Sequence, residues 1–332
     1  MHCSVVCAPS PWYSHIFFGL NNTITAHVIQ GLINTFFSTI FYMSSDIQAQ
    51  NDAIAQRCFE LNLLKTSMEC EKCLNATILK NSDGKDGLKW ECPNNACRKR
   101  YSIRKYSIFE NSNLNLGTIL CILAYFVNKL SPDAASKLLK MRKQTISKWY
   151  GIFREQLFFY YQLEQEYTQI GGIGKTVEID ECCLGKRKYE KGRVRKQLWI
   201  FGGIERENKK NWFIVPVKRR NAATLLPIIK LKIANGTTVN TDGWKAYRKL
   251  NELLPEKQFE HNWINHDTNF VSRTNPNVHT QNIECFWSNL RRFLRNIGTN
   301  YRKNLDLFIA EFYFRSKYLQ NFYEFLITVL KV

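Results

Sequence analysis

Residues 176–184 read Thr-Val-Glu-Ile-Asp-Glu-Cys-Cys-Leu, a largely apolar run that contains three acidic side chains. The run is typical of a buried strand. Two further runs, 197–204 and 211–217, follow it, and together the three predict an antiparallel meander. A helical pattern over 222–233 then leads to a fourth strand at 237–241, and the chain beyond is helical again. This order of elements predicts an α/β sheet with helices on its faces.

Three carboxylates stand out in that order. Asp180 falls inside the first strand, where an unpaired charge is costly unless it binds a metal or a partner. Asp242 ends the fourth strand, at the edge where open α/β sheets bind their ligands. Glu284 lies on a predicted helix beside an apolar stripe that includes Trp287. At steps of four, three and four along the same helix line come Ser288, Arg291 and Arg295, which we predict to bind DNA.

A cysteine quartet precedes this block, with Cys70 and Cys73 as one pair and Cys92 and Cys97 as the other. Two short cysteine hairpins can each place two thiolates on a tetrahedral ion, and the chain between them is long enough for a β-hairpin. We therefore predict a zinc ribbon over residues 66–110. Four cysteine ligands leave no position for water, so the single Zn²⁺ is structural. Four unrelated buried thiols are the alternative.

Residues 111–170 predict a helical DNA-binding region. Ser131 and Pro132 begin a short helix that ends at Leu139, and a turn at 140–142 leads to a helix with polar and basic first turns. This is a helix-turn-helix pattern, and its second helix would enter the major groove. The predicted DNA contacts are Lys143, Gln144, Thr145 and Lys148. Plain packing of a helical hairpin is the alternative, and the glycines at 171–174 suggest a flexible joint and a domain boundary near residue 170.

The charge balance points to an anionic partner. The 332 residues carry 47 Lys and Arg against 28 Asp and Glu, a formal net charge of +19 with a pI near 9.5. Nucleic acid is the simplest partner for such a chain. A hydrophobic content of 45% excludes a wholly disordered or multi-span membrane protein. The odd count of 11 cysteines favours metal binding in a reducing compartment over a disulfide framework.

The N-terminal stretch differs from the rest of the chain. Residues 1–45 contain no Asp, Glu, Lys or Arg, and polar residues interrupt the apolar run at 16–43. The interruptions argue against a membrane span, and the lack of a basic start argues against a signal peptide. We interpret residues 1–65 as an extension of unknown role, with Met43 as a candidate start, and we expect no membrane partner.

Six short motifs occur in order along the second half of the chain: Val-Glu-Ile-Asp-Glu at 177–181, Gly-Lys-Arg-Lys-Tyr at 185–189, Trp-Ile-Phe-Gly-Gly-Ile at 199–204, Thr-Asp-Gly-Trp-Lys-Ala-Tyr at 241–247, Ile-Asn-His at 264–266 and His-Thr-Gln-Asn-Ile-Glu at 279–284. They resemble motifs of the Merlin transposases, eukaryotic relatives of the bacterial ISXO-type insertion-sequence enzymes. The resemblance runs from about residue 60 to 320 and takes in the cysteine quartet. It implies a DDE transposase with Asp180, Asp242 and Glu284 as its acid triad, and the element order of 171–325 is that of a ribonuclease H-like domain.

Such an enzyme cuts a phosphodiester bond with water and then joins the freed 3′-hydroxyl to a target. Two divalent cations roughly 3.5–4 Å apart can activate the attacking oxygen and stabilise the leaving oxygen. Mg²⁺ or Mn²⁺ prefers carboxylate ligands, so we expect Asp180 to bridge the two ions, Asp242 to hold one and Glu284 to complete the other. Strand alternation puts Glu178 on the same face as Asp180, so a shift of register is the alternative.

Other polar residues near these motifs have two interpretations. His266 and His279 could support the active site by touching phosphate or orienting a water, or they could be packing residues. The basic run at 186–196 could be a solvated hairpin, but in a DNA enzyme it would grip the phosphate backbone. The residues of that run predicted to bind DNA are Lys186, Arg187, Lys188, Arg193 and Arg195.

Three classes of function follow from these observations. A cut-and-paste transposase would act on double-stranded DNA, both the terminal inverted repeats and the target. Joining two ends implies a homo-oligomer, at least a dimer. The eukaryotic resemblance implies a nuclear location. The other classes are an inactive DNA-binding descendant and a ribonuclease H-like nuclease or resolvase.

Overall fold

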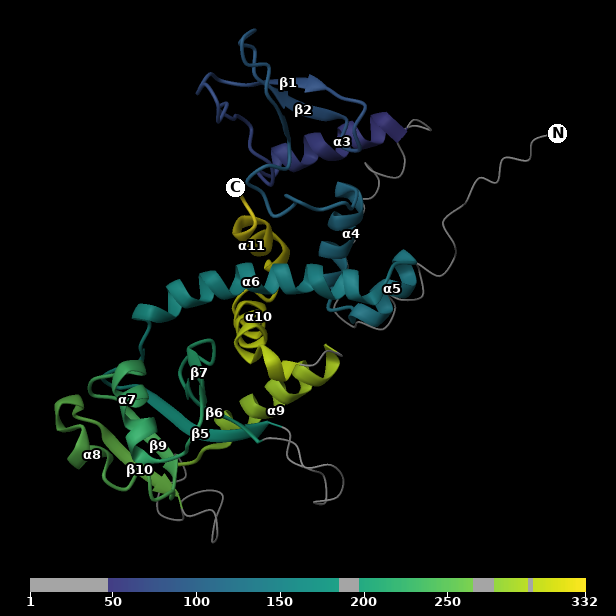
Figure 1. The fold of residues 1–332 in the computed structure, drawn as a ribbon. Helices are drawn as coiled ribbons and strands as arrows, with labels where there is room; N and C mark the ends of the chain where they lie inside the picture. The colour runs from purple at the N-terminus through teal and green to yellow at the C-terminus, as the bar shows by residue number, and fades with distance from the viewer. Residues whose placement is uncertain (1–46, 185–196, 265–277, 298–300) are drawn as a thin grey trace. The chain divides into compact units, whose positions relative to one another are not determined.

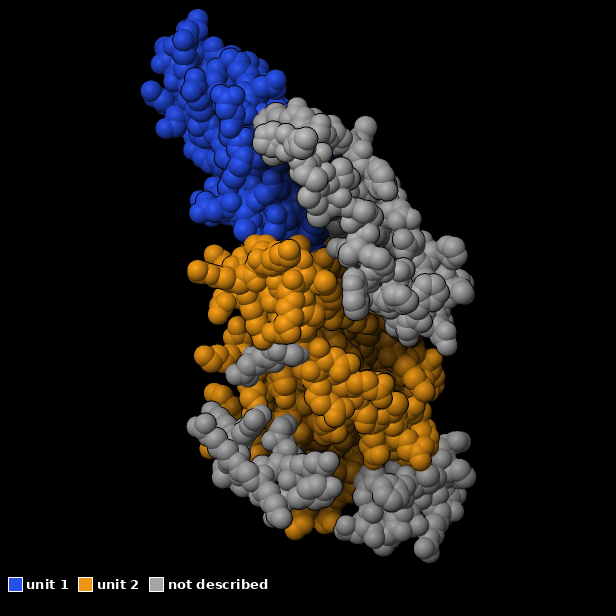
Figure 2. All heavy atoms as spheres, turned by 90° about the vertical axis from the view of Figure 1, so that its right-hand side faces the viewer, with its two compact units in different colours: residues 1–121, 330–332 blue, residues 122–329 orange. Residues whose placement is uncertain are grey.

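The computed structural model describes residues 47–184, 197–264, 278–297 and 301–332 (Figure 1). The chain forms two compact units, coloured separately in Figure 2. Unit 1 comprises residues 1–121 with 330–332, and unit 2 comprises residues 122–329. Among the helices in the described ranges, none is long and apolar enough to cross a membrane.

Unit 1 contains a small antiparallel sheet in the order β1 (Ile78–Asn81), β2 (Leu88–Glu91) and β3 (Arg100–Ser102). Leu79 lies opposite Trp90, and Trp90 lies opposite Tyr101. β1 and β2 form the hairpin that was predicted between the two cysteine pairs. The hairpin therefore brings the second pair back to the first.

Helix α3 (Ile47–Glu60) is part of unit 1, although the sequence analysis assigned it to an extension. Ala55 and Cys58 are fully buried, and the ring of Phe59 lies 6.4 Å from that of Trp90 in an edge-to-face arrangement. A helix that buries one side against the small sheet is a structural component. The part of residues 1–65 that begins at Ile47 therefore packs within unit 1.

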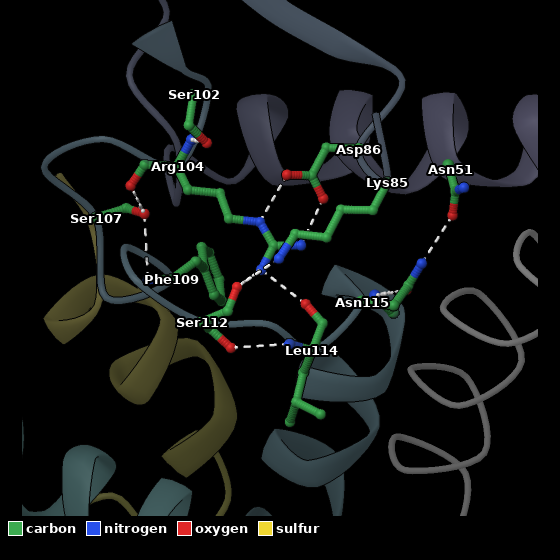
Figure 3. Close-up of polar contacts among 11 residues, drawn as sticks. Asn51, Lys85, Asp86, Ser102, Arg104, Ser107, Phe109, Ser112, Leu114 and Asn115 are labelled. Atoms are coloured by element: carbon green, nitrogen blue, oxygen red, sulfur yellow. Dashed lines mark hydrogen bonds and ion pairs between the residues drawn. The ribbon is translucent and has the colours of Figure 1, made fainter. Parts of the chain in front are cut away.

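A buried ion pair stabilises the loops of unit 1 (Figure 3). Arg104, only 2% exposed, donates from Nε and Nη2 to the two carboxylate oxygens of Asp86 at 2.7 and 2.5 Å. Its Nη1 also donates to the carbonyl oxygens of Ser112 and Leu114 at 3.1 and 2.7 Å. Arg104 thus has a structural role, because its planar guanidinium donates hydrogen bonds to several acceptors at once.

Helices α4 (Leu116–Val127), α5 (Pro132–Leu139) and α6 (Lys143–Tyr167) follow. Ser131 begins α5 as predicted, because its hydroxyl oxygen accepts a hydrogen bond from the backbone N–H of Ala134 at 3.2 Å. α5 ends at Leu139, and its C-cap residue Lys140 adopts a left-handed conformation at φ 51°. A short turn thus joins α5 to α6.

Within unit 2, α6 packs on α10 (Leu305–Lys317), which α11 (Phe322–Val329) follows. Arg154 of α6 donates to Glu311 at 2.6 Å, and Arg315 donates to the other carboxylate oxygen at 2.7 Å. All three side chains are buried. Because this packing joins α6 to the C-terminal helices, the predicted boundary near residue 170 falls inside one compact unit.

The main sheet of unit 2 has, in the described part of the chain, the order β10-β9-β5-β6-β7. The strands β5 (Thr176–Leu184), β6 (Leu198–Glu205), β7 (Trp212–Val217) and β9 (Thr238–Asp242) lie within one residue of their predicted bounds. β5, β6 and β7 are antiparallel as predicted, and β9 is parallel to β5. The strand β10 (Glu260–Ile264), parallel to β9, was not predicted.

Helices cover both faces of this sheet, which makes unit 2 a mixed α/β structure. Side chains of α7 (Ala222–Lys232) pack with Ile179 and Phe201 in one core, near the short helix α8 (Leu250–Leu253). On the other face lies α9 (Gln281–Asn296), which contacts β5 and β6 (Figure 1). The alternation of side chains along β5 therefore divides its residues between an apolar core and the α9 face.

The glycine-rich stretch at 171–174 forms a hydrogen-bonded turn, contrary to the predicted flexible joint. The pair β4 (Ile170–Gly171) and β8 (Ile233–Ala234) runs parallel beside it. Gly171 donates to the Glu205 carboxylate at 3.0 Å, and Gly172, at φ 118°, donates to the Thr237 hydroxyl at 2.8 Å. Glycine is needed here because the backbone adopts a positive φ. The sequence analysis interpreted these glycines as a flexible joint.

Candidate active site and metal centre

The three predicted carboxylates come from a strand interior, a strand end and a helix. β5 and β9 are parallel, and their last paired residues, Glu178 and Asn240, come two residues before Asp180 and Asp242. Glu284 lies in the first turn of α9, which packs against β5. The fold thus gathers three acids that are up to 104 residues apart in the sequence.

These carboxylates influence one another electrostatically. Burial, reinforced by the negative charges of Asp242 and Glu284, raises the pKa of Asp180 from 3.8 to about 6. Neighbouring like charges are unfavourable unless a cation neutralises them. Oxygen ligands of this kind suit Mg²⁺ or Mn²⁺, so the residues present fit a divalent-cation site.

Glu178 shares a strand face with Asp180 but has a different environment. Its side chain is fully buried and faces donors on every side. One oxygen accepts hydrogen bonds from the backbone N–H groups of Asn282 and Ile283 at 2.8 and 3.1 Å. The other accepts from the Asn282 amide and from Arg206, both at 2.7 Å. With its oxygens engaged in this way, Glu178 has no role as a free metal ligand, and the alternative register is disfavoured.

Trp287 orients Asp180. Its indole N–H donates to the Asp180 carboxylate at 3.0 Å, and the residue is only 2% exposed. Asp180 lies opposite Gly202 on β6, and a Cβ at Gly202 would come within 2.6 Å of the Trp287 ring. The sequence analysis placed Trp287 in the core but missed this polar contact, which its spacing of one helical turn from Glu284 could have indicated.

Glu181, next to Asp180, was also missed as a buried acid. Burial raises its pKa to about 7, although the Tyr247 hydroxyl donates a hydrogen bond that opposes the shift. Arg220 lies 3.9 Å from the Glu181 carboxylate and stacks on the ring of Trp199 at 3.8 Å. A pair of adjacent acids in one strand could signal that only one of them faces the site, because consecutive side chains point to opposite faces.

The two predicted supporting histidines have different outcomes. His279 lies beside Glu178, with Nδ1 at 3.4 Å from the carboxylate, and burial together with nearby Arg206 lowers its pKa. It therefore belongs to the surroundings of Glu178. His266 lies outside the described residues.

The helix line that continues from Glu284 is on the surface as predicted. Glu284, Ser288, Arg291 and Arg295 are all exposed, while the opposite side of α9 is buried. On α6, Lys143, Gln144 and Lys148 are exposed and Thr145 is half-buried. Both helices thus present basic side chains to solvent. The predicted DNA-binding residues Lys186, Arg187, Lys188, Arg193 and Arg195 lie outside the described residues.

A second centre is the cysteine quartet of unit 1. The sulfur atoms of Cys70, Cys73, Cys92 and Cys97 all lie within 4.8 Å of one another. Cys70 and Cys97 approach to 3.5 Å, and Cys73 and Cys92 approach to 3.4 Å. Four thiolates at the Zn–S distance of about 2.3 Å would be roughly 3.8 Å apart in a tetrahedron. The quartet could therefore hold a metal ion after small shifts of its side chains.

The electrostatics of the quartet are uneven. Hydrogen bonding by the Tyr101 hydroxyl, 3.4 Å from the sulfur, is the main cause that lowers the pKa of Cys70 to about 6. Burial raises the pKa of Cys92 to about 12. A bound metal would have to displace the proton from Cys92, because metal ligation requires the thiolate.

The described residues combine an α/β sheet, three acids on adjoining elements and a cysteine quartet in a strongly basic chain. Comparison with known proteins identifies the family. Residues 169–317 match the ISXO2-like transposase domain. An uncharacterized transposase-like protein of Haemophilus influenzae is 30% identical over 99 residues, which cover 30% of this chain and 75% of that protein. The chain belongs to the ISXO2-like transposase family.

Similar solved structures include a chain from the complex of the simian T-cell lymphotropic virus intasome with the PP2A regulatory subunit B56 gamma and a chain from the Mos1 transpososome. The first is 12% identical, with a TM-score of 0.27 and coverage of 57% of this chain and 66%, just under two thirds, of that chain. The second is 13% identical, with a TM-score of 0.25 and coverage of 63% and 78%. Scores this low support no inference about this chain.

Proposed function

We propose that this chain is a DDE transposase whose ribonuclease H-like domain cuts and joins DNA ends. The observation that carries the proposal is the meeting of Asp180, Asp242 and Glu284 in a member of the ISXO2-like family. Two Mg²⁺ or Mn²⁺ ions held there would activate the attacking oxygen and stabilise the leaving oxygen. The role of the protein is to hold the carboxylates in place, with Asp180 between Asp242 and Glu284. Trp287 orients Asp180 through a hydrogen bond.

DNA recognition would come from the remaining elements. The cysteine quartet, holding one structural Zn²⁺, would order unit 1, and the exposed start of α6 would enter the major groove of a terminal inverted repeat. The exposed arginines of α9 would contact phosphates next to the catalytic acids. Joining two ends requires at least a dimer, and a Merlin-type enzyme of a eukaryote would act in the nucleus.

The proposal is tested with the purified full chain and the DNA that flanks its own gene. Cleavage and strand transfer are measured with Mg²⁺ or Mn²⁺ for the wild type and for Asp180→Asn. We expect metal-dependent transfer that falls by at least about 10³-fold in the variant, because the bridging ligand is lost. End binding should be unchanged, since Asp180 is not among the predicted DNA-binding residues.

Two other outcomes would point to the remaining classes of function. Specific end binding without cleavage by either protein would indicate an inactive DNA-binding descendant. Cleavage of branched or hybrid substrates without strand transfer would indicate a nuclease or resolvase. Transfer that survives in Asp180→Asn would remove Asp180 from the catalytic role.

A further inference from the structure

Two polar links join β5, which carries Asp180, to α9, which carries Glu284. The first link is Glu178, a fully buried carboxylate on the α9 face of β5. It accepts the backbone N–H groups of Asn282 and Ile283, which are among the first helical residues of α9. These N–H groups have no partner within the helix, and the positive end of the helix dipole favours a carboxylate there.

The second link runs in the opposite direction, from α9 to β5. Trp287 donates its indole N–H to Asp180 at 3.0 Å. Gly202 allows this contact, because any larger residue on β6 would collide with the Trp287 ring. The indole is therefore fixed against the sheet as well as hydrogen-bonded to the predicted metal ligand.

Glu284 lies between the two links along α9. Asn282 and Ile283 precede it, and Trp287 follows it by three residues, slightly less than one turn. A helix that is hydrogen-bonded to a strand on both sides of one residue can neither slide nor rotate at that residue. The distance between the Glu284 and Asp180 side chains is thus set by the contacts of Glu178 and Trp287. It does not depend on a contact between the two carboxylates.

We propose that Glu178 and Trp287 form a brace that positions Asp180 and Glu284 for metal binding. The inference rests on the proposed function, since it concerns the same carboxylates, but it assigns roles to two residues outside the acid triad. Glu178 and Trp287 are positioning residues. They touch the strand, the helix and a ligand side chain, and they act on the metal through these.

Packing alone does not account for the brace. The apolar stripe of α9, with Ile283, Phe286 and Leu290 buried, already attaches the helix to the sheet. A buried carboxylate is costly compared with an apolar residue unless it is fully hydrogen-bonded. Glu178 is stabilised by Arg206 and by Asn282, so the sequence devotes three polar side chains to one helix end. Directional hydrogen bonds fix the position of α9 along β5, whereas apolar contacts alone would allow the helix to shift.

The experiment measures Mn²⁺ binding by the full chain with its zinc retained and other divalent cations removed by gel filtration, using the electron paramagnetic resonance signal of free Mn²⁺. The variants are Glu178→Gln and Trp287→Phe. Gln presents an amide donor where Glu178 accepts hydrogen bonds, and Phe keeps an aromatic ring while removing the indole donor. Loss of a group that orients a metal ligand typically weakens metal binding about 10–100-fold, and we expect this for both variants.

Glu205→Gln is the matched control. Glu205 is 1% exposed, lies on the adjacent strand β6 and also accepts a backbone N–H, that of Gly171. It contacts no part of α9 in the described hydrogen bonds. Its substitution should lower the thermal unfolding temperature as Glu178→Gln does, while Mn²⁺ affinity changes less than about 2-fold.

The outcomes separate the brace from the proposed function. If the wild type binds no Mn²⁺, or if Asp180→Asn binds it as well as the wild type, the proposed metal site fails. If the wild type binds Mn²⁺ and Asp180→Asn does not, but Glu178→Gln and Trp287→Phe both bind like the wild type, the brace is overturned. Should Glu178→Gln fail to fold, Trp287→Phe decides the question alone.

Discussion

At the scale of single residues, environment gives the acids of one strand different roles. Glu178 and Asp180 point to the same side of β5, yet Glu178 is enclosed by α9 and Arg206, while the charge of Asp242 acts on Asp180. Glu181, on the other side, is hydrogen-bonded by Tyr247. The type of residue is similar in all three cases, and the neighbours decide the chemistry. The same holds for Gly202, whose lack of a side chain makes room for Trp287.

The close approach at Gly202 predicts a clear stability difference. A Cβ there would lie 2.6 Å from the Trp287 ring and 2.7 Å from the backbone oxygen of Phe213, so Gly202→Ala forces the sheet or the indole to move. We expect a loss of about 1–3 kcal/mol in the free energy of unfolding, measured by urea denaturation. The control is Gly151→Ala in α6, where a Cβ would meet nothing within 4 Å. It should be neutral or stabilising by up to about 1 kcal/mol, and equal losses in the two variants would refute the contact.

At the scale of elements, the small sheet of unit 1 has little core of its own. Its three strands contain four, four and three residues, and every residue of β1 is exposed. Trp90 is buried against α3, and the buried pair of Arg104 and Asp86 closes the loops. Short strands with so few apolar contacts need a further constraint, and the cysteine quartet is placed to supply it.

Zinc removal should therefore unfold unit 1. We expect the purified chain to carry one zinc per chain, measured by elemental analysis, and Cys73→Ser to lose most of it. The far-UV circular dichroism of the variant should resemble that of the wild type after treatment with a chelator. Cys285→Ser is the control, because Cys285 is exposed on α9, and it should retain full zinc. Unchanged zinc content in Cys73→Ser would exclude the quartet as the binding site.

At the scale of the whole chain, residues far apart in sequence are joined by buried charges. Glu311 accepts from Arg154, 157 residues earlier, and from Arg315, which also donates to the carbonyl oxygens of Phe126 and Val127. Although burial by itself would raise the pKa of Glu311, the two guanidinium charges hold it below its ordinary value. The end of α4 and the helices α6 and α10 thus depend on one ionised carboxylate.

Because the folded-state pKa of Glu311 is lowered, its contribution to stability is present above the ordinary glutamate pKa of about 4.3 and is lost as the pH falls through the folded value. At pH 7, Glu311→Gln should cost about 3–5 kcal/mol in the free energy of unfolding, since it leaves two buried arginines unpaired. The difference from the wild type should shrink below about pH 4. Urea denaturation of the wild type and the variant across this pH range measures the loss at pH 7 and its decrease at low pH. Glu256→Gln, which removes an exposed ion pair with Lys230, should change stability by less than about 1 kcal/mol at any pH.

The sequence by itself determined the features that depend on local pattern. The strands β5, β6, β7 and β9, the cap of α5 and the polar start of α6 follow from periodicity and turn residues, which act over a few neighbours. The cysteine spacing predicted which thiols would meet, because a hairpin joins them. The three acids were named from their places on these elements and from the motifs they share with known transposases.

Tertiary structure alone decided the features that depend on partners distant in sequence. Helix α3 is part of unit 1 because Trp90 and its neighbours cover its apolar side, and the pairing of β10 with β9 needs an edge that only the folded sheet supplies. Glu178 and Trp287 became recognisable as positioning residues only once β5 and α9 were packed together. A side chain's role in these cases is set by what lies opposite it, and one-dimensional spacing does not encode that neighbour.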